Sequence, residues 1–252
     1  MKVSVILLAA GMGVRMGGAR PKAFLTLGGR HLYQHSLGVF RSMKEVGQVV
    51  LVVPKGRRDG VEGGPRRQDS VANGLREVNP ASDVILVHDA ARPFITPEVV
   101  RKVIQGALEH GGAVPGVPVR DTLKRVGDLG RVEATLDRTG LWAVQTPQGF
   151  RKGVLEAAYA AGHALEDATD EAQIVERAGG TVVVVEGLPE NFKITSKIDL
   201  LLAENYLSRR RRSRTTRGTP SLPHPAVAPE ERRRTHPAGA PQERRRTPRR
   251  RP

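Results

Sequence analysis

The stretch VSVILLAAGMGVRMGGARPKAF, residues 3–24, decides the fold. An apolar run over residues 3–8 leads directly into a glycine-rich loop that also carries Arg15 and Lys22. This arrangement predicts a buried strand followed by a tight turn whose backbone N–H groups can approach an anion closely. Because Arg15 and Lys22 can neutralise the negative charge of phosphate oxygens, the expected ligand is a phosphate group.

The glycine loop matches neither of the two best-known phosphate-binding patterns. Gly11 and Gly13 begin the dinucleotide fingerprint, but Met16 stands where its third glycine belongs. The P-loop pattern requires Lys and then Ser or Thr after its last glycine, whereas Ala19 and Arg20 follow here. The loop must therefore bind its phosphate in another way.

Composition excludes several classes of protein. The chain has 252 residues and no cysteine, which rules out a disulfide framework and a thiolate metal site. No apolar stretch approaches the roughly 20 residues that span a bilayer. The N-terminal apolar run has one flanking charge and meets glycines at once, unlike a signal peptide. We therefore expect a cytoplasmic protein with no membrane segment.

The net charge of +15 is concentrated at the C-terminal end. Residues 208–252 hold 15 Arg against three Glu, whereas residues 1–207 carry a net charge of only +3. The tail is rich in Arg and Pro and poor in large apolar side chains, which predicts disorder. It could bind RNA or another polyanion through counterion release, or be a dispensable extension. The tail has no aromatic residue to stack on bases, which disfavours nucleic acid.

Short apolar runs alternate with helical stretches along residues 1–207. The expected strands are residues 3–8, 49–53, 84–88, 112–117, 142–145 and 181–186. The expected helices are residues 31–43, 68–78, 96–110, 151–162, 170–178 and 196–207. This alternation predicts a Rossmann-like, three-layer α/β/α domain around a mostly parallel sheet. In such folds ligands bind beyond the carboxyl ends of the strands, so the loops there should carry the chemistry.

Residues 117–141 break the alternation. They contain a turn at residues 127–130 between two polar flanks that favour strands, which predicts a projecting β-hairpin. An isolated two-stranded hairpin is marginally stable in water. We therefore expect this arm to pack against a second subunit.

Three polar residues follow predicted strands or begin helices. Asp89 comes directly after the strand at 84–88 and can hold Mg²⁺ or a sugar hydroxyl. Arg92 can clamp a phosphate. Ser70 can contact a base or ribose, but the residues alone favour a helix cap by Asp69 or Ser70.

Taken together, seven motifs in register resemble the 2-C-methyl-D-erythritol 4-phosphate cytidylyltransferase family. The resemblance spans about residues 1–207. The motifs are AAGMGVRM…RPK (9–22), RQDSVANGL (67–75), VHDAARP (87–93), VPVRDTLKR (117–125), LDRTGLWAVQTPQGF (136–150), TDEA (169–172) and NFKIT (191–195).

The resemblance implies a nucleotidyltransferase-type fold and a specific reaction. CMP would pass from CTP to 2-C-methyl-D-erythritol 4-phosphate, giving 4-diphosphocytidyl-2-C-methyl-D-erythritol and pyrophosphate in non-mevalonate isoprenoid biosynthesis. Such a transfer needs positioning and charge neutralisation rather than a general base. Mg²⁺ is expected to bridge the CTP phosphates. Another alcohol phosphate such as ribitol 5-phosphate is the alternative acceptor, and polyanion binding by the tail is a more distant alternative.

The resemblance also assigns residues. The catalytic matches are Arg15, Lys22, Arg138 and Lys193: the first pair stabilises the transition state, and the second holds the acceptor phosphate. The CTP-binding matches are Ala9, Ala10, Gly11, Gly13, Gly64, Ser70 and Ala90. The acceptor-binding matches are Asp89, Arg92, Thr122, Thr146 and Thr169, and Asp89 is also the candidate metal ligand. In the family the arm swaps across a homodimer, so Thr122 and Arg138 are expected to serve the partner's site.

The sequence departs from the family pattern in three places. The segment over residues 53–64 is shorter than in the family, so a helix and a strand near the nucleotide base are expected to be missing. Ala23 replaces the usual Gln. The tail at 208–252 has no counterpart.

Overall fold

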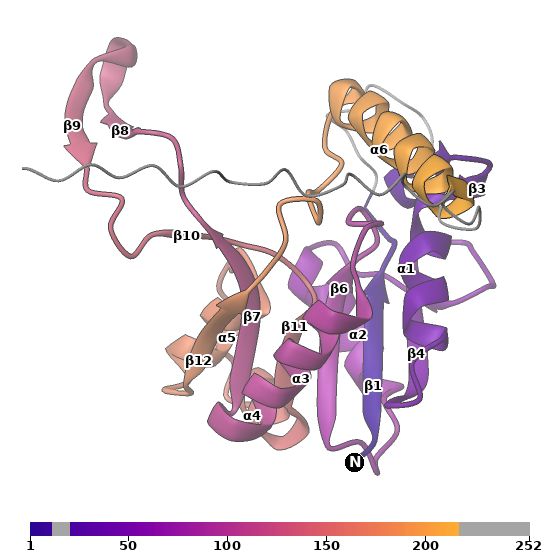
Figure 1. Ribbon diagram of the computed structural model, residues 1–252. Coiled ribbons are helices and arrows are strands. Elements are labelled where there is room, and N and C mark those ends of the chain that lie inside the picture. Colours follow the sequence, from indigo (N-terminus) through magenta and orange to yellow (C-terminus); the bar gives the residue numbers. More distant parts are fainter. Residues whose placement is uncertain (12–20, 217–252) are drawn as a thin grey trace, which may run out of the picture.

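The computed structural model describes residues 1–11 and 21–216, with side chains up to Arg210. It confirms the predicted α/β fold, with helices on both faces of a central eight-stranded sheet (Figure 1). The strand order is β10-β7-β11-β6-β1-β4-β5, and β12 pairs with β7. These strands are β1 (Val3–Leu8), β4 (Val46–Val53), β5 (Val61–Glu62), β6 (Val84–Asp89), β7 (Gly112–Pro118), β10 (Trp142–Val144), β11 (Gln148–Arg151) and β12 (Val182–Glu186).

The carboxyl ends of the central strands meet at one edge of the sheet. Strand β1 pairs in parallel with β4 and β6, and Leu8 lies opposite both Val52 and Asp89. Five of the six β1 residues are buried, because helices cover both faces of the sheet. The glycine loop therefore leaves β1 beside the end of β6, as the sequence predicts.

The helices divide between the two faces of the sheet. They are α1 (Leu32–Arg41), α2 (Arg67–Arg76), α3 (Pro97–His110), α4 (Lys152–Ala160), α5 (Glu171–Arg177) and α6 (Lys197–Thr216). Helices α2, α4 and α5 bury side chains in one apolar cluster, whereas α1 and α3 contribute to the cluster on the opposite face. Helix α3 begins where the sequence predicts, because the Thr96 side chain accepts the Val99 N–H and Pro97 occupies the first turn.

Strand β11 was not expected, because the sequence predicted a loop over its residues. It runs antiparallel between β6 and β7, near the middle of the sheet. Pro147 and Gly149 obscure the strand in the sequence pattern. Gly149 is required by close packing, since an added Cβ would lie 2.6 Å from Val103 Cγ1 of α3.

The short segment at 53–64 contains a strand that the sequence analysis expected to be missing. Val61 and Glu62 form β5, which pairs in parallel with the end of β4. Within this described segment, residues 54–60 form no helix. Instead the Arg57 guanidinium lies over the Phe24 ring, 4.1 Å from its centroid. Phe24 ends the short helix η2 (Lys22–Phe24), which leads to the small hairpin of β2 (Thr26–Leu27) and β3 (Arg30–His31).

Residues 117–141 form the predicted hairpin. Strands β8 (Leu123–Val126) and β9 (Val132–Leu136) pair antiparallel around the turn η3 (Asp128–Gly130), and they project from the sheet (Figure 1). Leu129 at the turn is 93% exposed. The pairing of this arm with a second subunit stays a prediction.

Helix α6 runs past the predicted domain boundary at residue 207, as far as Thr216. The remainder of the predicted disordered tail, residues 217–252, lies outside the described residues. In the part of the chain that the structure describes, no helix is long and apolar enough to cross a membrane.

Candidate active site

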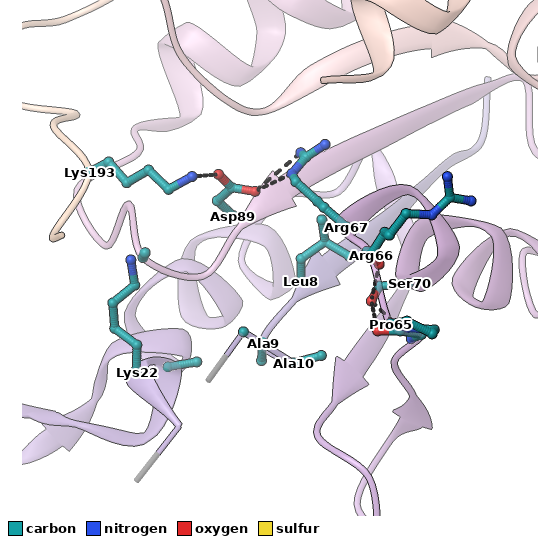
Figure 2. Close-up of a pocket in the computed structure, with 14 residues that line it drawn as sticks. Leu8, Ala9, Ala10, Lys22, Pro65, Arg66, Arg67, Ser70, Asp89 and Lys193 are labelled. Atoms are coloured by element: carbon teal, nitrogen blue, oxygen red, sulfur yellow. Dashed lines mark hydrogen bonds and ion pairs between the residues drawn. The ribbon is translucent and has the colours of Figure 1, made fainter. Parts of the chain in front are cut away.

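A cavity of about 410 Å³ opens at the carboxyl edge of the sheet, beyond β1 and β6. Figure 2 shows Lys22 and Lys193 on one side of it and Pro65, Arg66 and Ser70 on the other. The cavity is lined by Leu8, Ala9, Ala10, Gly11, Lys22, Ala23, Gly64, Pro65, Arg66, Arg67, Ser70, Asp89, Ala91 and Lys193. Its position is the one that the rule for open α/β sheets predicts for a ligand.

The residues after β1 form the floor of the cavity. The Ala9 N–H donates to Val52 O at 2.7 Å, which extends the β1–β4 pairing to the cavity edge. The Lys22 N–H donates to Gly11 O at 3.3 Å, so the two ends of the glycine loop are joined. Arg15 and Gly13, both predicted site residues, lie in the loop outside the described residues.

The turn before α2 forms one wall. Ser70 is buried, and its hydroxyl accepts the Gly64 N–H at 3.0 Å. The Asp69 side chain accepts the Arg66 N–H at 3.1 Å at the start of α2. The structure shows the helix cap that the sequence favours, because Asp69 satisfies the helix start, while Ser70 fixes the turn that carries Gly64 into the cavity. A contact from Ser70 to a nucleotide stays a prediction.

Asp89 lies between two cations at the end of β6. Its Oδ2 is 2.6 Å from Lys193 Nζ, and its Oδ1 is 3.2 Å from Arg67 Nη2 (Figure 2). Burial by itself would raise the pKa of Asp89, but Arg67 and Lys193 outweigh it and hold that pKa well below its usual range. The carboxylate is therefore ionised at neutral pH.

Lys193 comes from the segment after β12, far along the chain from the other lining residues. The Ile194 N–H donates to Ala91 O at 2.9 Å, and the buried Asn191 side chain donates to Thr146 O at 2.9 Å. The first bond holds the segment against the loop after β6, and the second holds it against the loop between β10 and β11. They place the Lys193 ammonium at the mouth of the cavity.

Sequence reasoning missed Arg67. It opens the quoted motif RQDSVANGL, but the motif was analysed for its serine. The Arg67 guanidinium bridges Asp89 and Glu171, whose Oε2 lies 2.6 Å from Arg67 Nη1. A positively charged residue at a helix start is usually solvated, so the sequence around Arg67 does not indicate its role. The signal that could have indicated it is the presence of two acids, Asp89 and Glu171, that need a cation.

Two predicted residues, Thr146 and Ala90, serve as supports around the cavity rather than as its lining. Thr146 Oγ1 accepts the Asp89 N–H at 3.1 Å and lies 3.0 Å from His88 Nδ1. Burial lowers the pKa of His88 to about 4, so this histidine is neutral and structural. Ala90 is fully buried, and its N–H donates to Leu8 O at 3.0 Å. Its neighbour Ala91 lines the cavity.

A second hollow of about 480 Å³ adjoins the first at the base of the arm. Lys193 lines both hollows. Arg92 lines the second, and its guanidinium donates to Asn191 O and Val144 O. The buried Arg92 Nε has no hydrogen-bond partner among the described residues. Burial also lowers the pKa of Arg92, as expected of a cation removed from water.

Three other predicted residues line neither hollow within one chain. Thr122 and Arg138 are exposed on the arm, where Arg138 donates to Arg120 O. Thr169 is exposed before α5, and its N–H donates to Gln173 Oε1 at 2.8 Å. None of the three is a lining residue of the hollows found among the described residues.

The donor set suits a metal that arrives with a nucleotide. Among the described residues, no three His, Asp or Glu side chains are grouped as a metal site. Asp89 is the carboxylate among the described lining residues of the first cavity. Mg²⁺ commonly takes one or two carboxylates and completes its shell with substrate phosphates and water. One carboxylate in a cationic cavity fits that pattern.

The fold and the cationic cavity define an α/β enzyme that acts on a phosphorylated ligand. The chain belongs to the IspD family, 2-C-methyl-D-erythritol 4-phosphate cytidylyltransferase, whose sequence model matches residues 3–209. This confirms the resemblance that the seven motifs carry.

Individual relatives agree with this assignment. The 2-C-methyl-D-erythritol 4-phosphate cytidylyltransferase of Alkaliphilus metalliredigens is 43% identical over 228 residues, covering 83% of this chain and 95% of that protein. The enzyme of the same name from Frankia casuarinae is 44% identical over 222 residues, covering 82% of each. The crystal structure of the Thermus thermophilus enzyme aligns with a TM-score of 0.71 at 41% identity. That alignment covers 83% of this chain and all of that one.

Proposed function

We propose that this chain transfers CMP from CTP to 2-C-methyl-D-erythritol 4-phosphate. The observation that carries the proposal is one cavity, at the carboxyl edge of the sheet, that gathers Lys22, Lys193 and the start of the glycine loop around Asp89. Membership of the family supports the same reaction.

The reaction needs no proton transfer at the attacking atom. An anionic oxygen of the acceptor's phosphate attacks the α-phosphorus of CTP, forming a new P–O bond. The bond from the α-phosphorus to the bridging oxygen breaks, and its electron pair leaves with pyrophosphate. Charge builds on the phosphorus oxygens, so the protein contributes through placed cations and N–H groups. The neutral, buried His88 is consistent with a site that uses no histidine base.

The nucleotide is best accommodated by the first cavity. The backbone after β1, at Ala9, Ala10 and Gly11, faces the turn that carries Gly64 across the same cavity. An added Cβ on Gly63 would lie 2.4 Å from Ala10 Cβ, so these two walls approach each other closely. A flat cytosine and its ribose suit such a slot, while Lys22 is placed for the phosphates.

The acceptor is best accommodated where the two hollows meet. Lys193 lines both, so its ammonium can hold the acceptor phosphate next to the α-phosphorus of CTP. Arg92 lines the second hollow, and its buried Nε lacks a hydrogen-bond partner among the described residues. An anionic substrate bound in the second hollow would place a negative charge beside the Arg92 guanidinium.

We further propose that the arm completes the site of a second copy of the chain. Thr122 and Arg138 are exposed on the arm and line neither hollow of their own chain, although Arg120, Asp121 and Leu123 line the second one. Their exposed side chains are therefore available to a second subunit. Exposed Leu141, Trp142 and Val144 at the base of the arm add an apolar surface suited to a subunit contact. The cytoplasmic location of the protein stays a prediction from the sequence.

Mg²⁺ would lie at Asp89 and neutralise charge on the CTP phosphates when it is bound. Asp89 already has Lys193 on one oxygen and Arg67 on the other. The contribution of the chain is to present one ionised carboxylate and to keep it in place.

The test is release of pyrophosphate from CTP and Mg²⁺ with two acceptors compared side by side. We expect fast release with 2-C-methyl-D-erythritol 4-phosphate and little with ribitol 5-phosphate. Release with ribitol 5-phosphate alone would keep the mechanism but reassign the acceptor. No pyrophosphate release with either acceptor would contradict the proposal. Salt-dependent RNA binding that disappears when residues 208–252 are removed would then identify the tail as the functional part.

A further inference from the structure

Glu171 is a fully buried carboxylate that does not line the cavity. It begins α5, and its side chain is 0% exposed. Its N–H donates to Gln148 Oε1 of β11 at 3.1 Å, and Tyr159 of α4 donates to its Oε1 at 3.4 Å. Burying a carboxylate is costly unless it is paired, so its place in the fold needs a reason.

The partner of Glu171 faces the cavity. Arg67 Nη1 lies 2.6 Å from Glu171 Oε2, while Arg67 Nε and Nη2 each lie 3.2 Å from Asp89 Oδ1. The guanidinium thus spans from the buried helix start to the carboxylate at the end of β6. Two cations and two carboxylates alternate in this chain of contacts, which ends at Lys193 in the cavity.

We propose that Arg67 is a positioning residue, anchored from behind by Glu171, which fixes Asp89 and through it Lys193 for the transfer reaction. The inference rests on the proposed function, because Asp89 and Lys193 act on the substrates there. Glu171 touches neither hollow, so its effect on turnover would pass through Arg67.

The two ends of this chain of contacts have different tasks. The Glu171–Arg67 end is buried and held by backbone and side-chain hydrogen bonds. The Lys193 end is 37% exposed, and an incoming phosphate competes with Asp89 for its ammonium. Because Arg67 remains on Oδ1, Asp89 keeps its orientation while its Oδ2 side becomes available to substrate.

The decisive variant is Glu171→Gln, which keeps the shape of the side chain and removes its charge. We expect kcat to fall about tenfold while KM for CTP stays within about threefold, because the loss is of orientation and not of nucleotide contacts. Arg67→Met should lower kcat about a hundredfold. The double variant should be no worse than Arg67→Met alone, because both changes break the same chain.

Glu45→Gln is the matched control. Glu45 pairs with Arg101 at 2.8 Å, just before β4 and thus at the edge of the sheet opposite the cavity. We expect its kinetics to match those of the unaltered protein. If Glu171→Gln lowers only the melting temperature and leaves kcat unchanged, Glu171 is merely structural and the inference is wrong.

A readout independent of turnover separates this inference from the proposed function. The Arg67 Nε–H donates to Asp89, so its NMR signal should be protected from exchange with water, and Glu171→Gln should remove that protection. Equal protection in both proteins would overturn the anchoring role, whatever reaction is catalysed. If the unaltered protein releases no pyrophosphate with any acceptor, the proposed function fails, and the exchange comparison still decides whether Glu171 anchors Arg67.

Discussion

Lys193 Nζ and Asp89 Oδ2 lie 2.6 Å apart at the mouth of the cavity, although one follows the last strand and the other ends a central strand. The pair holds an ammonium and a carboxylate next to the place where the two hollows meet. If the acceptor phosphate binds Lys193 as proposed, it takes the ammonium from Asp89, and binding exchanges one ion pair for another.

Replacing Lys193 with Met should weaken use of the acceptor far more than use of the nucleotide. We expect kcat/KM for 2-C-methyl-D-erythritol 4-phosphate to fall about a hundredfold, or roughly 2.7 kcal/mol, because a charged contact to phosphate is lost. Calorimetry should show little change in CTP affinity. Lys102→Met is the control, since Lys102 forms an exposed pair with Glu186. Equal losses for both substrates would argue against an acceptor role.

Lys22→Ala should act on the chemical step. Lys22 lines the cavity next to the start of the glycine loop. We propose that the α-phosphorus of CTP binds there, where charge on its oxygens increases during transfer. We expect kcat to fall about a hundredfold or more, with a much smaller rise in KM for CTP. Steady-state kinetics with varied CTP measure the split. A rise in KM with kcat unchanged would assign Lys22 to ground-state binding instead.

Mixed dimers should reveal an arm that works in trans. Arg138→Ala and Lys22→Ala subunits are each expected to be nearly inactive alone. If each site takes Arg138 from the partner and Lys22 from its own chain, mixing creates some sites with both residues intact. Activity should then recover toward one quarter of the unaltered level after subunit exchange, as random pairing dictates. No recovery in verified heterodimers would exclude the swapped arm.

Gly63→Ala should damage nucleotide binding. An added Cβ would lie 2.4 Å from Ala10 Cβ and 3.0 Å from Ser70 Oγ, which forces the two walls of the cavity apart. We expect KM for CTP to rise about tenfold, equivalent to about 1.4 kcal/mol. Gly153→Ala is the matched control, because an added Cβ there meets nothing within 4 Å. An unchanged KM would show that the walls do not contact the nucleotide.

Asp199 should make the stability of α6 depend on pH. Its Oδ2 accepts the N–H groups of Thr195 and Ser196 at 2.7 and 2.8 Å. Burial raises the pKa of Asp199, but these hydrogen bonds outweigh burial and lower that pKa below its ordinary value. The stabilisation is therefore present above the unfolded-state pKa of about 3.9 and is lost as the pH falls through the lower folded-state value.

Urea unfolding of Asp199→Ala measures that contribution. We expect a loss of about 1 kcal/mol at neutral pH, the usual effect of removing a helix cap, and a smaller difference near about pH 3. A difference that stays constant with pH would show that the charge of Asp199 contributes nothing.

The sequence predicted the parts of the site that directly follow an unbroken apolar run. The apolar run of β1 and the run that ends in Asp89 each mark a buried parallel strand, and parallel strands bring their carboxyl ends to one edge. The sequence pattern alone therefore predicts that Ala9, Ala10 and Gly11 lie beside Asp89.

Other parts depend on contacts that no local pattern records. Strand β11 carries Gly149 because α3 packs closely against it. A four-residue run that contains a glycine does not show the residue pattern of a strand. Arg67 and Glu171 meet across helices α2 and α5, so neither shows its role in its own motif. Thr146 was predicted only as a substrate contact, so its hydrogen bonds with His88 and the Asp89 N–H were not foreseen.

The most direct test of the account follows phosphorus from CTP into the product. In one reaction CTP carries the label on its α-phosphorus, and in a second reaction it carries the label on its γ-phosphorus, with 2-C-methyl-D-erythritol 4-phosphate as the acceptor in both. CMP transfer predicts that the α-label enters the alcohol product and the γ-label leaves as pyrophosphate. Entry of the γ-label into the product, or release of the α-label as free CMP without the acceptor, would contradict the account.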